Sequence, residues 1–288
     1  MNSALPHVVE ATSASLASRI IELVDADEVS LPPLPQVVVK ARELLSSESA
    51  NAKALGTLLS QDSAIVTSLM RLANSAAFGG LGRVDSLNTA IQRIGQRQIG
   101  AIVMGLGLKG HYKTSNPAKA QVLEVLWNHS VTSAFAARAI AARTGMDPER
   151  AFLAGLLHDC GKVLVLSALD LMHSRKEVSA LSVATVHELM RALHCELGHR
   201  VLEAWKLPSD VAQVALLHHE PKLLDHGLVL PVKAANLITR RLGFHLEPDP
   251  TLSIVEDPVI EELGLTDLQV ATLMVEMELH LEEMRQLF

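Results

Sequence analysis

Histidine and aspartate are the residues in this chain whose types and spacing could support chemistry. Eight of the 13 histidines lie between residues 129 and 219, where an even spread over 288 residues would place about four. Imidazole and carboxylate groups on the inward faces of helices are costly to bury unless they contact each other or a metal. The clustering therefore predicts a binding site built from histidine and carboxylate side chains.

Four of these histidines lie on apolar stripes of separate expected helices. Helical spacing aligns each with small or aliphatic residues one and two turns away, and the four are His129, His158, His194 and His218. Taken singly, each is better explained as a core histidine that is hydrogen-bonded to a backbone carbonyl. Taken together, they favour a shared site, because histidines from several helices can converge in the core of a bundle and bind a metal there.

The residues that follow His158 extend the chemistry of this predicted site. Asp159 adds an oxygen ligand for a cation, and Lys162, one helical turn later, could reach an anionic ligand such as phosphate. Gly161 is expected to interrupt the regular helix and to let another part of the backbone come close. His219 ends its own helix and is expected at the mouth of the pocket.

The other histidines and both cysteines are expected to lie outside the site. Five histidines align with no apolar stripe and are predicted to lie at the surface, namely His7, His111, His226, His245 and His280. The pattern leaves three undecided, which are His173, His187 and His199. Cys160 has no second cysteine near it in sequence, so a small core residue is favoured over a metal ligand or nucleophile. With Cys195 it cannot form a disulfide framework, which favours a reducing, cytoplasmic setting.

The composition indicates an all-α protein with an aliphatic core. Hydrophobic residues make up 49% of the chain and aromatic residues only 3%, and Ala and Leu are among the best helix formers. No segment shows the sustained alternation that is typical of a strand. The longest stretch without a polar side chain, Ile99–Leu108, is too short to cross a bilayer, so a soluble protein with no membrane segment is expected.

Charge is distributed unevenly along the chain. The net charge of −7 argues against nucleic acid as a direct partner. Residues 246–288 contain 11 acidic residues and one basic residue, a net charge of −10, whereas residues 1–245 contain 24 basic and 21 acidic residues. The sequence therefore predicts an acidic C-terminal element on a nearly neutral body.

Proline and capping signals divide the chain into a lead-in, residues 1–30, and two helical subdomains of a multi-helix bundle, residues 31–115 and 116–288. The sequence LPPLPQ at 31–36 is expected to be extended, and Thr114–Pro117 places candidate caps before a proline. Helices are expected at about 9–24, 35–45, 52–59, 63–74, 87–95, 96–108, 117–143, 148–159, 163–173, 181–205, 209–219 and 229–242, and from a capping box of Thr266 and Gln269 to the C-terminus.

The last expected helix carries an apolar seam. Its members recur at alternating steps of four and three residues, and they are Val270, Met274, Met277, Leu281, Met284 and Phe288. Such a seam packs against another helix. Packing on the chain's own domain is favoured, and a homodimer through this seam is the alternative.

Three segments of the second half resemble the HD superfamily of metal-dependent phosphohydrolases, and within it the HD-related output domain, HDOD. They are LWNHSVTSAFAARAIA (126–141), AFLAGLLHDCGKVLV (151–165) and WKLPSDVAQVALLHHEP (205–221). In the first half, LPPLPQV (31–37), SQDSAIVTSLMRLANSAAF (60–78) and LNTAIQRIGQRQIG (87–100) resemble the helical lead-in of the same family. The resemblance covers about residues 27–242 and implies an HD-like fold for the C-terminal half.

The resemblance also implies a ligand set. His129 and the pair His158–Asp159 match the first metal ligands of catalytic HD proteins, and Lys162 matches the lysine that contacts phosphate. Three further histidines match the additional ligands of the cyclic-dinucleotide phosphodiesterases of the HD-GYP branch, namely His194, His218 and His219. The centre would hold a divalent metal such as Fe or Mn, or no metal at all.

The chain departs from the catalytic pattern at three places. Asn236 stands where the family has its closing aspartate, and an amide binds a cation more weakly than a carboxylate. Val125 stands where some relatives carry a ligating glutamate. The tripeptide Gly-Tyr-Pro expected after the paired histidines is missing, since Tyr112 is the only tyrosine in the chain.

Two hypotheses follow. The favoured one is a non-catalytic output or scaffold module of bacterial signal transduction with a degenerate metal and phosphate pocket. Its expected partners are signalling proteins, such as a receiver domain, a kinase or a diguanylate-type output domain. The alternative is a metal-dependent phosphohydrolase that acts on a nucleotide or a cyclic dinucleotide, with metal-activated water as the nucleophile. Retention of nearly all the histidines supports the second, and the loss of a carboxylate at Asn236 supports the first.

Overall fold

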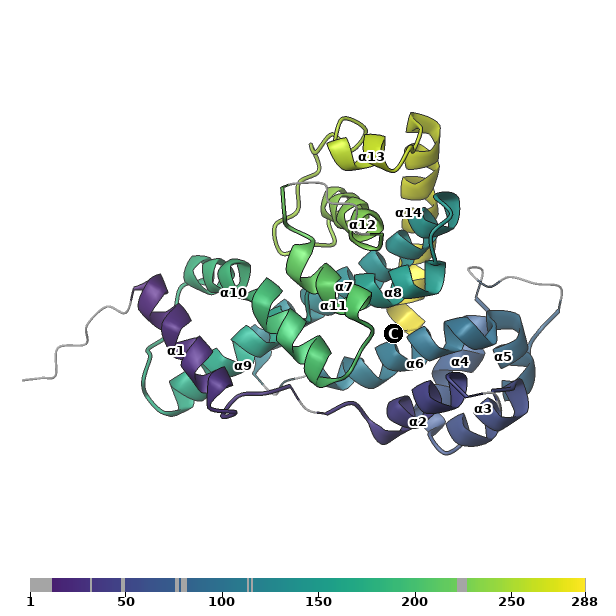
Figure 1. Cartoon of the computed structure of the whole chain (residues 1–288), viewed down its shortest axis with the longest axis horizontal. Helices are drawn as coiled ribbons and strands as arrows, with labels where there is room; N and C mark the ends of the chain where they lie inside the picture. Colours follow the sequence, from purple (N-terminus) through teal and green to yellow (C-terminus); the bar gives the residue numbers. More distant parts are fainter. Residues whose placement is uncertain are drawn as a thin grey trace, which may run out of the picture.

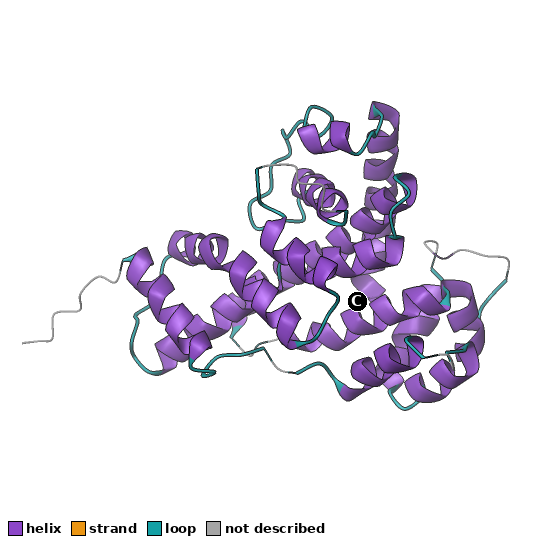
Figure 2. Cartoon of the chain, viewed as in Figure 1, coloured by secondary structure: helices purple, strands orange, loops and turns teal. Residues whose placement is uncertain are grey.

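The computed structural model describes residues 12–31, 33–47, 50–75, 78, 82–112, 114, 116–221 and 227–287, and only the backbone of residues 118 and 280–287. Over these residues the chain forms helices and no strand (Figure 2). The all-α class expected from the composition is therefore confirmed.

The helices of the first half are α1 (Ser13–Asp25), α2 (Gln36–Leu45), α3 (Ala52–Leu59), α4 (Ser63–Ala73), α5 (Leu87–Ile94), α6 (Gln96–Leu108) and the short 3-10 helix η2 (Lys109–Tyr112). Those of the second half are α7 (Pro117–Arg143), α8 (Pro148–Leu157), α9 (Cys160–Ser174), α10 (Val183–Ala204), α11 (Ser209–Leu217), α12 (Val229–Arg241), α13 (Pro258–Glu262) and α14 (Asp267–Leu287). Most of them lie where the sequence predicts them.

The predicted caps explain this agreement. The Asp62 carboxylate accepts hydrogen bonds from the first backbone amides of α4, and Asp147 does the same for α8, where Pro148 follows it. At the start of α14, Thr266 and Gln269 form the predicted reciprocal capping box, with the Thr266 amide donating to Gln269 Oε1 at 2.9 Å. Local side-chain chemistry thus sets where these helices begin.

Three details differ from the predictions. The helix expected at 148–159 ends at Leu157, and α9 begins at Cys160, so the interruption falls at the His158–Asp159 pair and Gly161 lies inside α9. The first helix begins at Ser13, where Thr12 caps it. The short helix α13 was not predicted, because its five residues are too few to show a helical period.

The two halves of the molecule pack around α6 and α7. Helices α2 to α6 pack on one another in the first half, and α6 also contacts α8 (Figure 1). In the second half the long helix α7 packs against α8, α12 and α14, while α10 packs against α9 and α11. Helix α1 crosses to the second half and packs on α9 and α10. One continuous aliphatic core results, and it surrounds the candidate site.

Helix α14 packs on its own chain, as the sequence favours. Val270 and Met277 from the predicted seam are buried, and Arg143 on α7 donates to both carboxylate oxygens of Glu276 at 2.7 Å. The side chains of Leu281, Met284 and Phe288 lie outside the described residues.

One stretch, Pro148–Ser174, is long and apolar enough to cross a membrane by length and composition. However, 89% of its most apolar window is buried within the protein. This degree of burial is what the core helices of a globular domain show.

Candidate metal centre

Five titratable side chains from five helical segments meet in the core of the second half. His129 comes from α7, His158 and Asp159 from the junction of α8 and α9, His194 from α10 and His218 from the end of α11. Each is at most 2% exposed to solvent. The sequence prediction that these stripes converge is therefore confirmed by their placement.

Each of the four histidines is oriented by its own backbone contact. The Nδ1 atom of His129 lies 2.7 Å from the carbonyl oxygen of Phe244, and that of His158 lies 2.7 Å from the carbonyl of Gly155. His194 and His218 make the same kind of contact with carbonyls of their own helices. A carbonyl can only accept, so each Nδ1 carries a proton, and in the neutral ring each Nε2 then offers a lone pair.

The lone pairs of these rings face one another. Nε2 of His129 lies 3.2 Å from Nε2 of His158, and Nε2 of His194 lies 3.3 Å from Nε2 of His218. Two acceptors at this separation make no hydrogen bond when both protons are on Nδ1. A cation between the nitrogens would satisfy both, and the proton on the far nitrogen is the arrangement that metal-ligating histidines show.

Asp159 stands between the two histidine pairs. Its Oδ2 atom lies 3.2 Å from His129 Nε2, and its Oδ1 atom lies 3.4 Å from His194 Nε2 and 3.6 Å from that of His218. Lys162 donates to Oδ2 at 2.5 Å, whereas Oδ1 is buried and receives no hydrogen bond from the described residues. A buried carboxylate oxygen without a donor is costly, and a cation on that side would remove the cost.

The ligand atoms therefore form two groups that share one carboxylate. The first is His129, His158 and Asp159, and the second is Asp159, His194, His218 and His219; within each group the atoms lie within 4.8 Å of one another. Imidazole and carboxylate donors in this number suit Fe, Mn and similar ions. The residues present thus fit the metal that the HD resemblance implies.

Burial controls the ionisation of this centre. Desolvation lowers the pKa of His158 well below its usual value and lowers the pKa of His194 to about 4, so both rings are neutral at neutral pH. Burial alone would raise the pKa of Asp159, but the ammonium of Lys162 and the contacts with the neighbouring histidines together outweigh it and hold that pKa well below the usual value. The neutral rings of His158 and His194 therefore lie beside an ionised carboxylate.

A close approach of two helices makes the second group possible. Gly161 in α9 lies so near α10 that a β-carbon there would stand 2.1 Å from the carbonyl oxygen of His194 and 2.6 Å from the amide nitrogen of Gly198. Any larger residue would push α10 away. The predicted role of Gly161 in allowing close backbone approach is confirmed, although it does not break the helix.

A cavity of about 440 Å³ opens beside the second group. Lys162, His194, His218 and His219 line one side of it, and Asn236 of α12 lines another. The Oδ1 atom of Asn236 is buried and accepts no hydrogen bond from the described residues. The degenerate position thus lines the cavity beside the second ligand group.

His219 lies at the mouth of this cavity, where the sequence places it. Its ring is exposed, and its centroid lies 4.1 Å from that of His218 and 5.1 Å from that of His194. Desolvation and then these two neighbouring rings lower its pKa.

His245 belongs to the site, and the prediction that it lies at the surface is wrong. The residue is half-buried, lines the same cavity, and packs its ring edge-on to that of His129 with centroids 5.0 Å apart. Desolvation lowers its pKa to about 3. It follows α12 in a segment without helical period, so spacing could not reveal it.

The other histidines whose side chains the structure describes lie outside the site. His111 is half-buried against Trp205, with ring centroids 5.8 Å apart, so its surface prediction is also wrong. The undecided residues divide into exposed His173 and partly buried His187 and His199. The structure of His7 and His226 and the side chain of His280 fall outside the described residues.

Cys160 is a core residue, as predicted. It is buried, its thiol donates to the carbonyl of Gly198 at 3.8 Å, and burial raises its pKa to about 12. A thiol with so high a pKa is neither a nucleophile nor a ready ligand.

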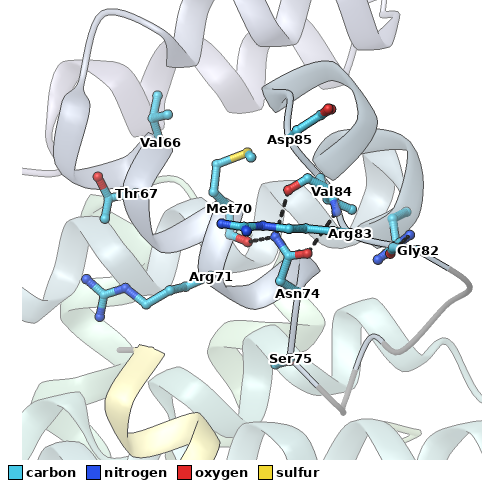
Figure 3. A pocket seen from close by; sticks show the side chains of 11 residues that line it. Val66, Thr67, Met70, Arg71, Asn74, Ser75, Gly82, Arg83, Val84 and Asp85 are labelled. Carbon is cyan, nitrogen blue, oxygen red and sulfur yellow. Dashed lines mark hydrogen bonds between the residues drawn. The ribbon is translucent and has the colours of Figure 1, made fainter.

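A second and larger hollow, of about 1150 Å³, lies in the first half between α4 and the segment before α5 (Figure 3). At its centre the Asn74 amide joins the two walls: Nδ2 donates to the carbonyls of Met70 and Val84 at 2.9 Å, and Oδ1 accepts from the Val84 amide at 2.8 Å. No histidine lines it among the described residues. We therefore place the functional site in the second half.

The described residues form helices and carry a buried His–Asp centre in the second half, as the HD resemblance implies. The chain matches the HDOD domain family over residues 31–221 and belongs to that family. The resemblance of the chain to the HDOD family is thus confirmed.

Comparisons with individual proteins agree on the fold. A crystal structure of a candidate metal-dependent phosphohydrolase from Shewanella amazonensis SB2B is similar with a TM-score of 0.79 and 20% identity, over 96% of this chain and 98% of that one. An HDOD domain protein of unknown function from Geobacter sulfurreducens is similar with a TM-score of 0.70 and 21% identity, over 96% and 99% of the two chains. At these identities the likeness establishes the shared fold.

Among curated proteins, the chain is 26% identical over 247 residues to an uncharacterized protein of Treponema pallidum (strain Nichols). The match covers 81% of this chain and 46% of that protein, so the chain spans about half the length of the relative it matches.

Proposed function

We propose that this chain is a bacterial signalling module whose His–Asp centre binds a divalent metal ion and an anionic ligand without hydrolysing that ligand. Fe and Mn are the candidate ions. The observation that carries the proposal is the set of acceptors around Asp159. Four imidazole Nε2 atoms lie in two pairs, 3.2 and 3.3 Å apart, beside an Asp159 oxygen that is buried and receives no hydrogen bond from the described residues, and cations would satisfy these acceptors together.

The content of the ligand shell argues against turnover. Among the described residues, Asp159 is the one carboxylate in either ligand group, and its charge is already paired with Lys162. Asn236 faces the cavity with an amide where a carboxylate would hold the ion more tightly. Activation of water needs a firmly held metal with an open position. A site with this charge supports binding and sensing.

The experiment combines metal content with a generic phosphodiesterase assay. We expect the purified protein to retain Fe or Mn, measured by mass spectrometry of the ions, and to leave bis-p-nitrophenyl phosphate intact. The Asn236→Asp variant restores the missing carboxylate, and turnover in that variant alone would identify Asn236 as the reason for inactivity. A wild-type protein free of metal after growth in Fe- and Mn-supplemented medium would contradict the proposal.

A metal-dependent phosphohydrolase is the second candidate. It is favoured by the two ligand groups that share Asp159, because a shared carboxylate is how two ions are held close together. In that case Lys162 would neutralise charge on a phosphoryl group. Hydrolysis by the wild-type protein that is lost in His158→Ala would establish this function in place of the first.

We propose further that the module acts in the cytoplasm through other signalling proteins, such as a receiver domain, a kinase or a diguanylate-type output domain. The family supports this assignment, and the greater length of the Treponema relative is consistent with additional domains beside such a module. Co-purification of a tagged full-length chain under native conditions tests it, and recovery of the chain without any signalling protein would count against it.

A further inference from the structure

The segment that follows α12 is built against the first ligand group. Helix α12 ends at Arg241, and Gly243 takes a φ of 87°, which reverses the chain and lets the Phe244 amide donate to the Thr239 carbonyl at 2.8 Å. This turn aims the Phe244 carbonyl at His129 Nδ1, 2.7 Å away. The next residue, His245, therefore lies over the His129 ring.

This segment is also tied to two helices. The Glu247 carboxylate accepts a hydrogen bond from Arg191 of α10 at 2.6 Å, and the Glu247 carbonyl accepts one from Arg240 of α12 at 3.2 Å. The Asp249 amide donates to the Arg240 carbonyl at 3.1 Å. His245 is therefore held in a defined position at the edge of the cavity.

The backbone of this segment fixes the tautomer of His245. The Glu247 amide donates to His245 Nδ1 at 2.9 Å. The Glu247 carbonyl also lies 3.1 Å from this nitrogen, but that carbonyl already accepts a hydrogen bond from Arg240, whereas the Glu247 amide can only donate and makes the shorter contact. Nδ1 therefore accepts, and the proton of the neutral ring is on Nε2. His245 is thus opposite in tautomer to the four candidate ligands, whose protons are on Nδ1.

Nε2–H of His245 is a donor that the described part of the protein leaves unused. The ring lines the cavity, and no hydrogen bond of its Nε2 with another described residue is formed. Other cationic groups of the cavity are already engaged: Lys162 with Asp159, Lys233 with the carbonyl of Glu220, and Arg191 with Glu247. A donor that faces a cavity beside a cation site suits an oxyanion bound to that cation.

We infer that His245 is a ligand-binding residue that donates a hydrogen bond through Nε2–H to an oxygen of a phosphate group bound at the metal centre. The inference rests on the proposed function, because it needs an anion in this pocket. His245 is not a further metal ligand, since the nitrogen that faces the cavity carries the proton. Lys162 would attract the phosphate by its charge, and His245 would orient the phosphate through a directional hydrogen bond.

The test is calorimetric titration with inorganic phosphate of protein loaded with Mn²⁺ and freed of unbound ion. We expect His245→Leu to weaken phosphate binding by on the order of tenfold, because a hydrogen bond to a charged acceptor is lost. His245→Gln keeps an N–H donor and should recover much of the affinity. His173→Leu, the same change at an exposed histidine outside the cavity, should bind phosphate like the wild type.

A separate titration with Mn²⁺ alone distinguishes ligand contact from packing on His129. Unchanged Mn²⁺ affinity with weakened phosphate binding supports the inference. Equal phosphate affinity in His245→Leu and wild type overturns it, and so does a loss of Mn²⁺ affinity that accounts for the whole effect. Wild-type protein that binds Mn²⁺ but no phosphate overturns this inference and leaves the metal site standing, whereas protein that binds neither overturns both.

Discussion

The hollow of the first half and the cavity beside the candidate centre differ in the state of the polar groups that line them. In the larger one, of about 1150 Å³ in the first half, the Asn74 amide is satisfied by backbone groups on both walls. In the smaller one, of about 440 Å³ in the second half, Asn236 Oδ1 in the lining and Asp159 Oδ1 in the adjoining centre receive no hydrogen bond from the described residues. The Asn74 amide therefore has a structural role, since it holds the two walls of its hollow together. The cavity beside the centre instead has buried acceptors that a bound ligand would satisfy. Unmet acceptors that lie beside converging histidines, and not size, therefore mark the site.

The most severe test of this comparison removes the carboxylate that both ligand groups share. Loss of a residue that only orients a metal ligand costs roughly 10- to 100-fold in metal affinity. We therefore expect Asp159→Asn to lower the affinity for Mn²⁺, measured by calorimetry, by at least that factor. Asp170→Asn is the matched control, because Asp170 is largely exposed and pairs with Lys119 outside the site. Equal Mn²⁺ affinity in both variants would mean that the centre binds no metal through Asp159.

The second test uses pH on metal-free protein. The pKa of His194 falls from 6.5 to about 4 because the ring is buried. Between these values the unfolded chain binds a proton that the folded chain does not, so the free energy of unfolding falls as the pH is lowered. We expect a decrease of about 2 kcal/mol from this residue between pH 7 and pH 5, measured by urea unfolding.

A variant separates His194 from the other groups that titrate. His194→Gln cannot gain that proton, so its stability should fall less over the same interval, while His173→Gln, at an exposed position, should follow the wild type. His158 is shifted in the same direction, so part of the slope should remain. Identical slopes in all three proteins would show that His194 is not held neutral by burial.

The third test restores charge at the degenerate position. Asn236→Asp adds a carboxylate to the cavity beside the second ligand group, and unit charges about 4 Å apart attract by roughly 4 kcal/mol at the effective dielectric near a protein surface. Desolvation offsets part of this, so we expect the Mn²⁺ affinity to rise about tenfold. Asn88→Asp adds the same charge on an exposed face of α5 and should leave the affinity unchanged. A weaker metal affinity in Asn236→Asp would place the ion elsewhere.

The helices could be predicted from the sequence more completely than the site, because helix starts depend on local contacts and part of the site depends on distant ones. Caps such as Asp62 and Asp147 act within one turn, so the helix starts that they set can be predicted locally. Helical spacing identified the four buried histidines because one face of each helix must be apolar. His245 escaped because its position depends on the turn at Gly243 and on Arg191 from a distant helix. Nothing local encodes such a contact.

The smallest expected effect lies in the hollow of the first half. Asn74→Ala removes the amide that joins α4 to the segment before α5, and we expect a loss of about 1 to 2 kcal/mol in the free energy of unfolding, because backbone groups of Val84 lose their partner. Asn88→Ala is the control, since this exposed side chain forms no hydrogen bond with the described residues. Mn²⁺ and phosphate affinities should match the wild type in both variants. If Asn74→Ala weakened phosphate binding instead, the larger hollow would take part in ligand recognition, and the contrast between a structural role and a ligand site would no longer hold.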